Sequence, residues 1–219
     1  MRNSAAAVTM VCLFAPALHA GNDVEIIASG GPSFPLRGLE RLVGIGYRIA
    51  GSVQFDLNEN VGLVFTSGFM RWRFDSDRIN AAMAGEGLAQ GYAVRGPFQS
   101  VPVMLGARLI LDGSAVRPYI GIMGGAYFLR WSMAGTQTTG GTTTSLASVT
   151  RSWTEPATSL DAGLLIALGG DLWVDLGGSY SAFSNSANRV DPAAVLGQSA
   201  IATNTASQVS VSAGFRLVL

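Results

Sequence analysis

Apolar and polar residues alternate along much of this chain, most plainly at its C-terminal end. Every second residue there is apolar: Val209, Val211, Ala213, Phe215, Leu217 and Leu219. The residues between them are mostly small or polar: Ser210, Ser212, Gly214, Arg216 and Val218. A period of two is typical of a β-strand whose two faces meet different surroundings, whereas a helix would repeat about every 3.6 residues.

The same alternation predicts four further strands, at residues 41–57, 101–111, 160–168 and 172–180. Two other segments, residues 61–75 and 119–131, also have the composition of strands. The first carries apolar residues on both faces and the second is interrupted by glycines. The outward-facing residues of these two strands therefore stay undetermined.

The connections between these strands alternate in length. Short turns are expected at residues 58–60, 112–117 and 169–171. Long polar segments, which we expect to be loops, lie at residues 76–95, 134–155 and 186–203. The middle one is rich in Thr and Gly and is expected to be mobile.

Short turns on one side and long loops on the other are typical of bacterial outer-membrane barrels. Such barrels place both termini on the turn side, which requires an even number of strands. Residues 22–32 supply the eighth strand, with Val24, Ile26 and Ala28 facing outward. We therefore predict an all-β fold, an eight-stranded antiparallel up-and-down transmembrane β-barrel, over residues 21–219.

Composition indicates which face of the barrel meets lipid. Hydrophobic residues make up 48% of the chain and charged residues only 13%, about half the usual charged share. No stretch after the first twenty residues is long and apolar enough for a transmembrane helix. A soluble barrel would place its apolar face inside, but here the polar face is mostly Gly, Ser and Ala, which suits a crowded lumen. We expect the apolar face to be outside.

The first twenty residues read as a signal peptide. Arg2 provides the positive charge, an apolar stretch follows, and small residues offer cleavage after Ala20 or Ala17. This segment, residues 1–20, contains the chain's single Cys and single His. The exported chain is therefore expected to have neither.

Two motifs resemble those of a known family. The ending Gly214-Phe215-Arg216-Leu217-Val218-Leu219 is similar to the C-terminal signal that outer-membrane proteins present to their insertion machinery, with Leu in place of the usual final Phe. The segment Arg117-Pro118-Tyr119-Ile120-Gly121 resembles a strand start common in the OmpA/OmpX/OmpW-like superfamily of small barrels. The resemblance implies a location in the bacterial outer membrane and contact with its lipids. We expect a barrel alone, without the periplasmic domain of full-length OmpA-type proteins.

Candidate chemistry is sparse. The resemblance implies that enzymes among such barrels use a His, which the exported chain would lack, so no Ser-His nucleophile is available. Asp161 and Asp175 have no spacing that favours acid–base catalysis. We expect no enzyme, no cofactor and no metal site. Net charge is zero, which gives no reason to expect nucleic acid as a partner.

Inward-facing charges are the most informative polar residues. We expect a lumen charge network of Glu25, Arg48, Asp56, Arg108, Asp161, Asp175 and Arg216. Arg216 should lie between Asp175 and Glu25, because the last strand lies between the strands that carry them. Pairing is expected because a lone buried charge is costly. The pairs either plug the lumen or form a gate that rearranges.

A second group lies near the second long loop. Arg71, Arg73, Trp72 and Trp131 are expected at a rim that faces lipopolysaccharide, with the arginines toward its phosphates. The alternative is that these arginines pair with Asp75, Asp77 and Glu86.

The functional expectation is a non-enzymatic, monomeric outer-membrane barrel. Its role would be in envelope integrity or in surface interaction through its long extracellular loops. The alternatives are a narrow channel for small solutes and, less favoured, a lipid-modifying enzyme.

Overall fold

The computed structural model describes residues 24–85, 91–184 and 205–219. Most of them lie in nine strands: β1 (Val24–Leu36), β2 (Gly46–Asn58), β3 (Val61–Arg73), β4 (Tyr92–Arg95), β5 (Pro97–Ile110), β6 (Val116–Thr139), β7 (Thr142–Gly169), β8 (Leu172–Ser184) and β9 (Thr205–Val218). A short 3₁₀ turn, η2 (Leu39–Arg41), and one helix, α2 (Ser76–Gly85), complete the described fold. No helix in these described ranges is long and apolar enough to cross a membrane.

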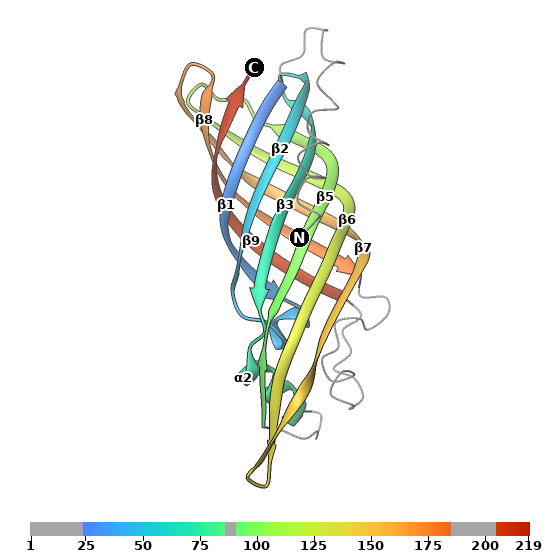
Figure 1. Cartoon of the computed structure of the whole chain (residues 1–219). Helices are drawn as coiled ribbons and strands as arrows, with labels where there is room; N and C mark the ends of the chain where they lie inside the picture. Colours follow the sequence, from blue (N-terminus) through green and yellow to red (C-terminus); the bar gives the residue numbers. More distant parts are fainter. Residues whose placement is uncertain (1–23, 86–90, 185–204) are drawn as a thin grey trace.

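Eight of the strands form a closed ring (Figure 1). Each pairs antiparallel with its neighbours in the order β1, β2, β3, β5, β6, β7, β8, β9, and β9 pairs back onto β1. Closure leaves no free sheet edge along the shared length of the strands. The prediction of an eight-stranded up-and-down barrel is confirmed, and β1 supplies the strand expected at residues 22–32. The additional strand β4 pairs with β6 beyond the end of β5.

The outer face of the ring is apolar and the inner face carries the polar residues, the reverse of a soluble barrel. Exposed aliphatic and aromatic side chains lie on every strand of the ring, among them Ile26, Ile49, Leu63, Leu105, Ile122, Leu164, Leu176 and Phe215. Buried charged side chains include Glu25, Arg108, Asp161, Asp175 and Arg216. A surface of this kind is stable only when covered by an apolar phase such as lipid.

Short turns lie at the end of the barrel that also holds the C-terminus and the start of β1 (Figure 1). In the β2–β3 turn, the Asn58 side-chain oxygen accepts hydrogen bonds from the backbone N–H groups of Asn60 and Val61. In the β7–β8 turn, Gly169 and Gly170 have φ of 120° and 56°, values that favour glycine. The three predicted short turns are therefore at one end, which we call the turn end.

The opposite end, the loop end, is more ordered than the sequence predicted. Residues 76–95 were expected to be a loop, but they contain α2 and β4. Residues 134–155 were expected to be a mobile loop, but β6 and β7 extend into it as a hairpin, with Gly140 and Gly141 at φ of 57° and 82°. Paired glycines with positive φ fit a type I′ turn. The expected signal peptide, residues 1–20, and the expected loop at 186–203 lie outside the described residues.

The start of the second strand also differs from the prediction. The alternation placed it at residue 41, but β2 begins at Gly46 because Gly38, with φ of 83°, turns the chain into η2. This turn brings Leu39, Leu42 and Val43 into the interior, where all three are buried. With Ile79 and Met83 of α2, they close the loop end of the barrel.

Candidate functional site

Arg108 of β5 lies at the centre of a polar network in the turn-end half of the lumen. Its guanidinium forms an ion pair with Asp161 of β7, with Nη2 2.9 Å from Oδ2, and Nε also donates to that oxygen at 3.2 Å. Nη1 donates to the Gln54 side-chain oxygen of β2 at 3.4 Å. Gln54 in turn donates to Asp56 at 2.6 Å. The network therefore joins three strands across the interior.

Tyr119 of β6 connects this group to Asp175. The Arg108 guanidinium lies 4.2 Å from the centre of the Tyr119 ring, within the range of a cation–π contact. The Tyr119 hydroxyl donates to Asp175 Oδ1 at 2.7 Å. Asp175 was expected beside Arg216, but its hydrogen-bond partner is a tyrosine, which sequence reasoning had assigned only to a strand motif.

Glycines on the inner wall make room for these side chains. A Cβ at Gly121 would lie 2.3 Å from Asp161 Oδ1, and a Cβ at Gly62 would lie 2.7 Å from the Gln54 side chain. Gly163 and Gly177 likewise leave space for the Tyr119 hydroxyl. The glycines within the strands are thus sites of close approach, and they permit a dense network in a narrow barrel.

The other inward charges are also engaged. Arg216 forms an ion pair with Glu25 across the β9–β1 closure, as its strand position suggested. Arg48 donates to the Ser179 hydroxyl at 2.8 Å. The structure therefore brings together Arg108 with Asp161 and Arg216 with Glu25, while Arg48 bonds a neutral partner.

The space left inside the network is small. A cavity of about 30 Å³ lies among Arg48, Arg108, Tyr119, Asp161 and Asp175. A cavity needs roughly 10–15 Å³ to hold one water molecule, so this cavity has room for one or two waters. No sugar or amino acid fits there without moving these side chains.

The loop-end half of the lumen is filled by aromatic and sulfur-containing side chains. Its buried members include Met70, Trp72, Phe98, Met104, Met123, Tyr127, Leu129, Trp131, Met133, Trp153 and Phe183. Trp72 packs on Phe98 with ring centres 5.6 Å apart, and Tyr127 stacks on Phe183 at 5.3 Å. The sequence analysis missed this group, although the apolar residues on both faces of residues 61–75 were its signal.

This half also contains buried polar residues, among them Glu155 of β7 and Gln208. Gln208 of β9 is completely buried. Its side-chain nitrogen donates to the Tyr127 hydroxyl at 3.1 Å, and its oxygen accepts from the Ser33 hydroxyl at 3.0 Å. These bonds tie β9 to β6 and β1 and satisfy an amide that would be costly to bury alone.

The expected rim residues separate into two sets. Arg71 and Arg73 face outward on β3, with Arg73 exposed and Arg71 half-buried. Trp72 and Trp131 do not face lipopolysaccharide, because each is only 1% exposed and packs inside the barrel. The reason is strand parity, since Trp72 lies between two outward arginines and must point the other way.

The expected alternative for the arginines was pairing with nearby carboxylates. Asp75 forms its ion pair with Arg78, at 3.3 Å, and not with Arg71 or Arg73. In the described part of the chain, no ion pair involves Arg71 or Arg73, and Glu86 lies outside it. Among the described residues, these two guanidinium groups therefore have no carboxylate partner.

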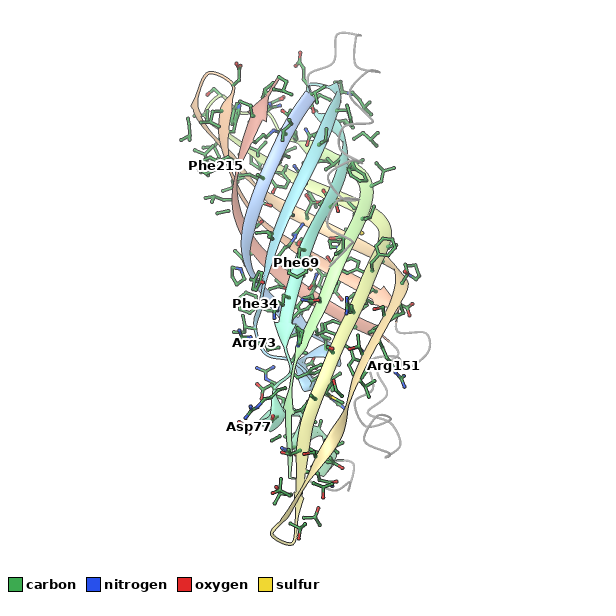
Figure 2. The ribbon with its side chains drawn as sticks, viewed as in Figure 1. Phe34, Phe69, Arg73, Asp77, Arg151 and Phe215 are labelled. Carbon is green, nitrogen blue, oxygen red and sulfur yellow. The ribbon has the colours of Figure 1, made fainter. Side chains whose placement is uncertain are left out.

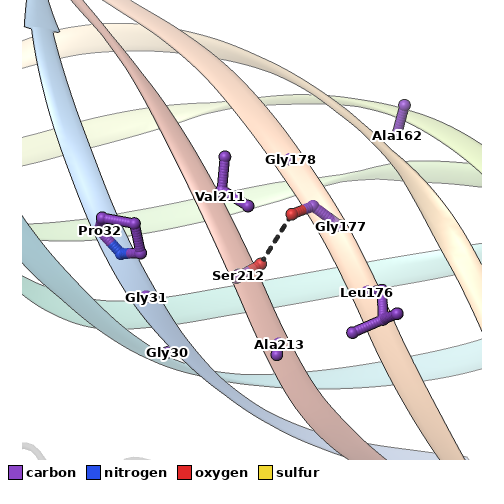
Figure 3. Close-up of a pocket in the computed structure, with 10 residues that line it drawn as sticks. All are labelled: Gly30, Gly31, Pro32, Ala162, Leu176, Gly177, Gly178, Val211, Ser212 and Ala213. Atoms are coloured by element: carbon purple, nitrogen blue, oxygen red, sulfur yellow. Dashed lines mark hydrogen bonds between the residues drawn. The ribbon is translucent and has the colours of Figure 1, made fainter.

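A shallow groove of about 620 Å³ lies on the outer face of β1, β7, β8 and β9 (Figure 3). Its lining includes Gly30, Gly178, Val211 and Ala213, and none of its residues is charged. The Ser212 hydroxyl donates to the backbone oxygen of Gly177 and is thereby satisfied. The groove offers apolar contact only.

Among the described residues, no group of three His, Cys, Asp or Glu is placed to hold a metal ion. No family model matches the chain, and no curated protein matches it in sequence.

Solved structures do resemble it. Ail, the attachment invasion locus protein of Yersinia pestis, in complex with the heparin analogue sucrose octasulfate, aligns at TM-score 0.51 and 12% identity, covering 90% of this chain and 100% of that one. A major outer membrane protein from Thermus thermophilus aligns at TM-score 0.50 and 16% identity, covering 91% and 100%. The outer membrane protease OmpT from Escherichia coli aligns at TM-score 0.42 and 8% identity, covering 90% and 97%. This chain has the fold of the small outer-membrane β-barrels.

Proposed function

We propose that this chain is a closed, non-enzymatic barrel of the bacterial outer membrane, exported by residues 1–20 and inserted through its C-terminal strand. It acts in envelope integrity or surface contact through its loop end and its outer face, as a monomer. The observation that carries this proposal is the filled lumen. Polar side chains block the turn-end half, and apolar side chains block the loop-end half.

The available carboxylates support a structural role over a catalytic one. Asp161 and Asp175 are buried, at 8% and 5% exposure, and bond to Arg108 and Tyr119 inside the barrel. A lipid substrate would lie on the outer face and could not contact them. The chain's only His and Cys, His19 and Cys12, fall in the expected signal peptide.

Planar-bilayer recording of the purified, refolded chain tests the closed lumen. We expect no discrete, reproducible conductance steps, because side chains fill both halves of the described lumen. A shift in gel migration between unheated and heated samples would show that the added protein is a folded barrel. Reproducible single-channel steps from such a sample would contradict the proposal and favour a narrow solute channel.

A matched variant tests whether the loop-end half closes the lumen by itself. Arg108→Ser combined with Asp161→Ser removes both charges of one ion pair and shortens both side chains. We expect this variant to admit water into the turn-end half but not to conduct, because the apolar side chains of the loop-end half remain in place. Conduction by this variant alone would show that the polar network is what closes the lumen.

A further inference from the structure

Four outward-facing arginines near the loop end lie on the wall formed by β3, β5, β6 and β4. Arg71 and Arg73 are on β3, Arg95 on β4 and Arg130 on β6, and all four face outward. Strands β3, β4, β5 and β6 contain no Asp or Glu. On the other side, β1 and β8 contain no Arg, and the one Arg of β9, Arg216, points inward. This wall therefore carries positive charge without a carboxylate on its own strands, while Arg37, Arg41 and Arg151 are exposed elsewhere at the loop end.

The strand register aligns two of these arginines. Arg71 pairs with Gln99 of β5, Gln99 pairs with Arg130, and Arg130 pairs with Ser152 of β7. Neighbouring strands lie about 4.8 Å apart, so the backbones at Arg71 and Arg130 are roughly 10 Å apart with an uncharged amide between them. Two arginine side chains at this spacing can converge on one phosphate above Gln99.

The residues one step toward the turn end are apolar. Val101 of β5 pairs with Phe128 of β6, and Phe69 of β3 pairs with Ile49 of β2. In Figure 2, Phe69 lies on the barrel wall and Arg73 lies nearer the end that holds α2. The change from aromatic to cationic residues marks the level where hydrocarbon gives way to headgroups.

A groove crosses this boundary. It has a volume of about 410 Å³ and is lined by both kinds of residue, with Phe69, Val101 and Phe128 on the apolar side and Gln99, Arg130 and Ser152 on the polar side. In the described ranges, none of Arg71, Arg73, Arg95 and Arg130 has a carboxylate partner. A ligand that fits this groove needs an acyl chain on the apolar side and a phosphate on the polar side.

We propose that this groove binds a phosphorylated, anionic lipid of the outer leaflet, with its phosphate on Arg71 and Arg130 and an acyl chain over Phe69 and Phe128. Arg73 and Arg95 lie farther toward the loop end and contact further anionic groups of the same headgroup. Four guanidinium groups without carboxylates favour a headgroup with no cation of its own, such as a phosphorylated glycolipid, over a zwitterionic one. The proposal rests on the outer-membrane location proposed above.

Titration of the refolded barrel with lipid A in detergent micelles, followed by native mass spectrometry, tests this site. The probes are diphosphorylated lipid A and the same lipid with its phosphates removed. For Arg71→Gln combined with Arg130→Gln, we expect affinity for the diphosphorylated lipid to fall by about tenfold or more, because two charge-assisted contacts are lost. The dephosphorylated lipid should bind wild type and variant equally weakly.

The control variant combines Arg37→Gln with Arg41→Gln. These arginines are exposed near the same end, between β1 and β2, away from the strands that carry Arg130 of the groove and Arg71 beside it. This variant loses the same amount of positive charge as the variant with Arg71→Gln and Arg130→Gln. We expect its affinity for the diphosphorylated lipid to change by less than about twofold, because long-range attraction is screened by salt. A loss equal to that of the groove variant would overturn the site in favour of general charge attraction.

Two other results would overturn the proposal. The first is unchanged binding by the groove variant when its heat-modifiable migration shows a folded barrel. The second is displacement of the lipid by millimolar inorganic phosphate, which would show that the acyl chain contributes nothing. Conductance in the bilayer recording would contradict the closed lumen but would leave this binding result unaffected, so the two failures are distinguishable.

Discussion

The two halves of the lumen are filled in opposite ways. The turn-end half contains ion pairs and hydrogen bonds centred on Arg108, whereas the loop-end half contains aromatic and methionine side chains with one buried amide, Gln208. Both halves are enclosed by the same ring of strands, whose outer face is apolar except near the loop end, where Arg71, Gln99 and Arg130 face outward. The difference shows that alternation reports the outer face well wherever that face is apolar, while the inner face can be of either kind.

Each half depends on a different interaction. In the turn-end half, a buried charge is stable only when it is paired with an opposite charge. Removing one member of a pair therefore leaves the other uncompensated. The loop-end half is stabilised by close packing, which is lost in proportion to the volume removed. The two halves should therefore respond differently to substitution.

The largest effect is expected from Arg108→Met. It removes the partner of Asp161 and the cation above Tyr119, and it leaves a carboxylate buried among strands. We expect the free energy of unfolding to fall by about 3–5 kcal/mol, measured by urea titration of the barrel in lipid vesicles. Arg108→Met combined with Asp161→Leu should recover much of that loss. If the double variant recovers no stability, the ion pair contributes more than the mutual neutralisation of its two charges.

A smaller effect is expected in the loop-end half. Met104→Ala empties part of the apolar filling, where the side chain is 3% exposed, and should cost about 2–4 kcal/mol. Its neighbour on the strand, Leu105, is 54% exposed on the outer face. Leu105→Ala leaves no internal cavity because lipid fills the space, so its cost in the same titration should be clearly lower. Equal losses would mean that this half is loosely packed.

The smallest effect on the free energy of unfolding is expected from two glycine substitutions. They compare a position packed against the polar network with one outside it. Gly121→Ala places a methyl group against the Asp161 carboxylate and should cost about 1–3 kcal/mol. Gly124 is on the same strand, and a Cβ there meets nothing within 4 Å. Gly124→Ala should be neutral or slightly stabilising by the same measurement, because alanine has fewer unfolded conformations. A cost at Gly124 equal to that at Gly121 would rule out crowding as the cause.

The predictions from the sequence were correct where residues of one type occupy one kind of position in the fold. The outward residues of β9 and β1 were identified correctly because the outer faces of these strands are apolar along most of their length. Residues 134–155 were misassigned as a loop because Thr and Gly are common in loops, and only pairing with the opposite strand makes them a hairpin. Trp72 and Trp131 were placed at the rim by residue type, although the inward phase of their strands buries them.

The sequence by itself determined the barrel, its strand number and its apolar exterior, because a period of two is a local property of the chain. It also placed the single His and the single Cys of the chain within the first twenty residues. Only the tertiary structure decided which charges meet, since ring closure brings residues from distant strands together across the lumen. The pairing of Arg108 with Asp161 and the alignment of Arg71 with Arg130 both depend on strand register, a property of pairs of strands that no single segment contains.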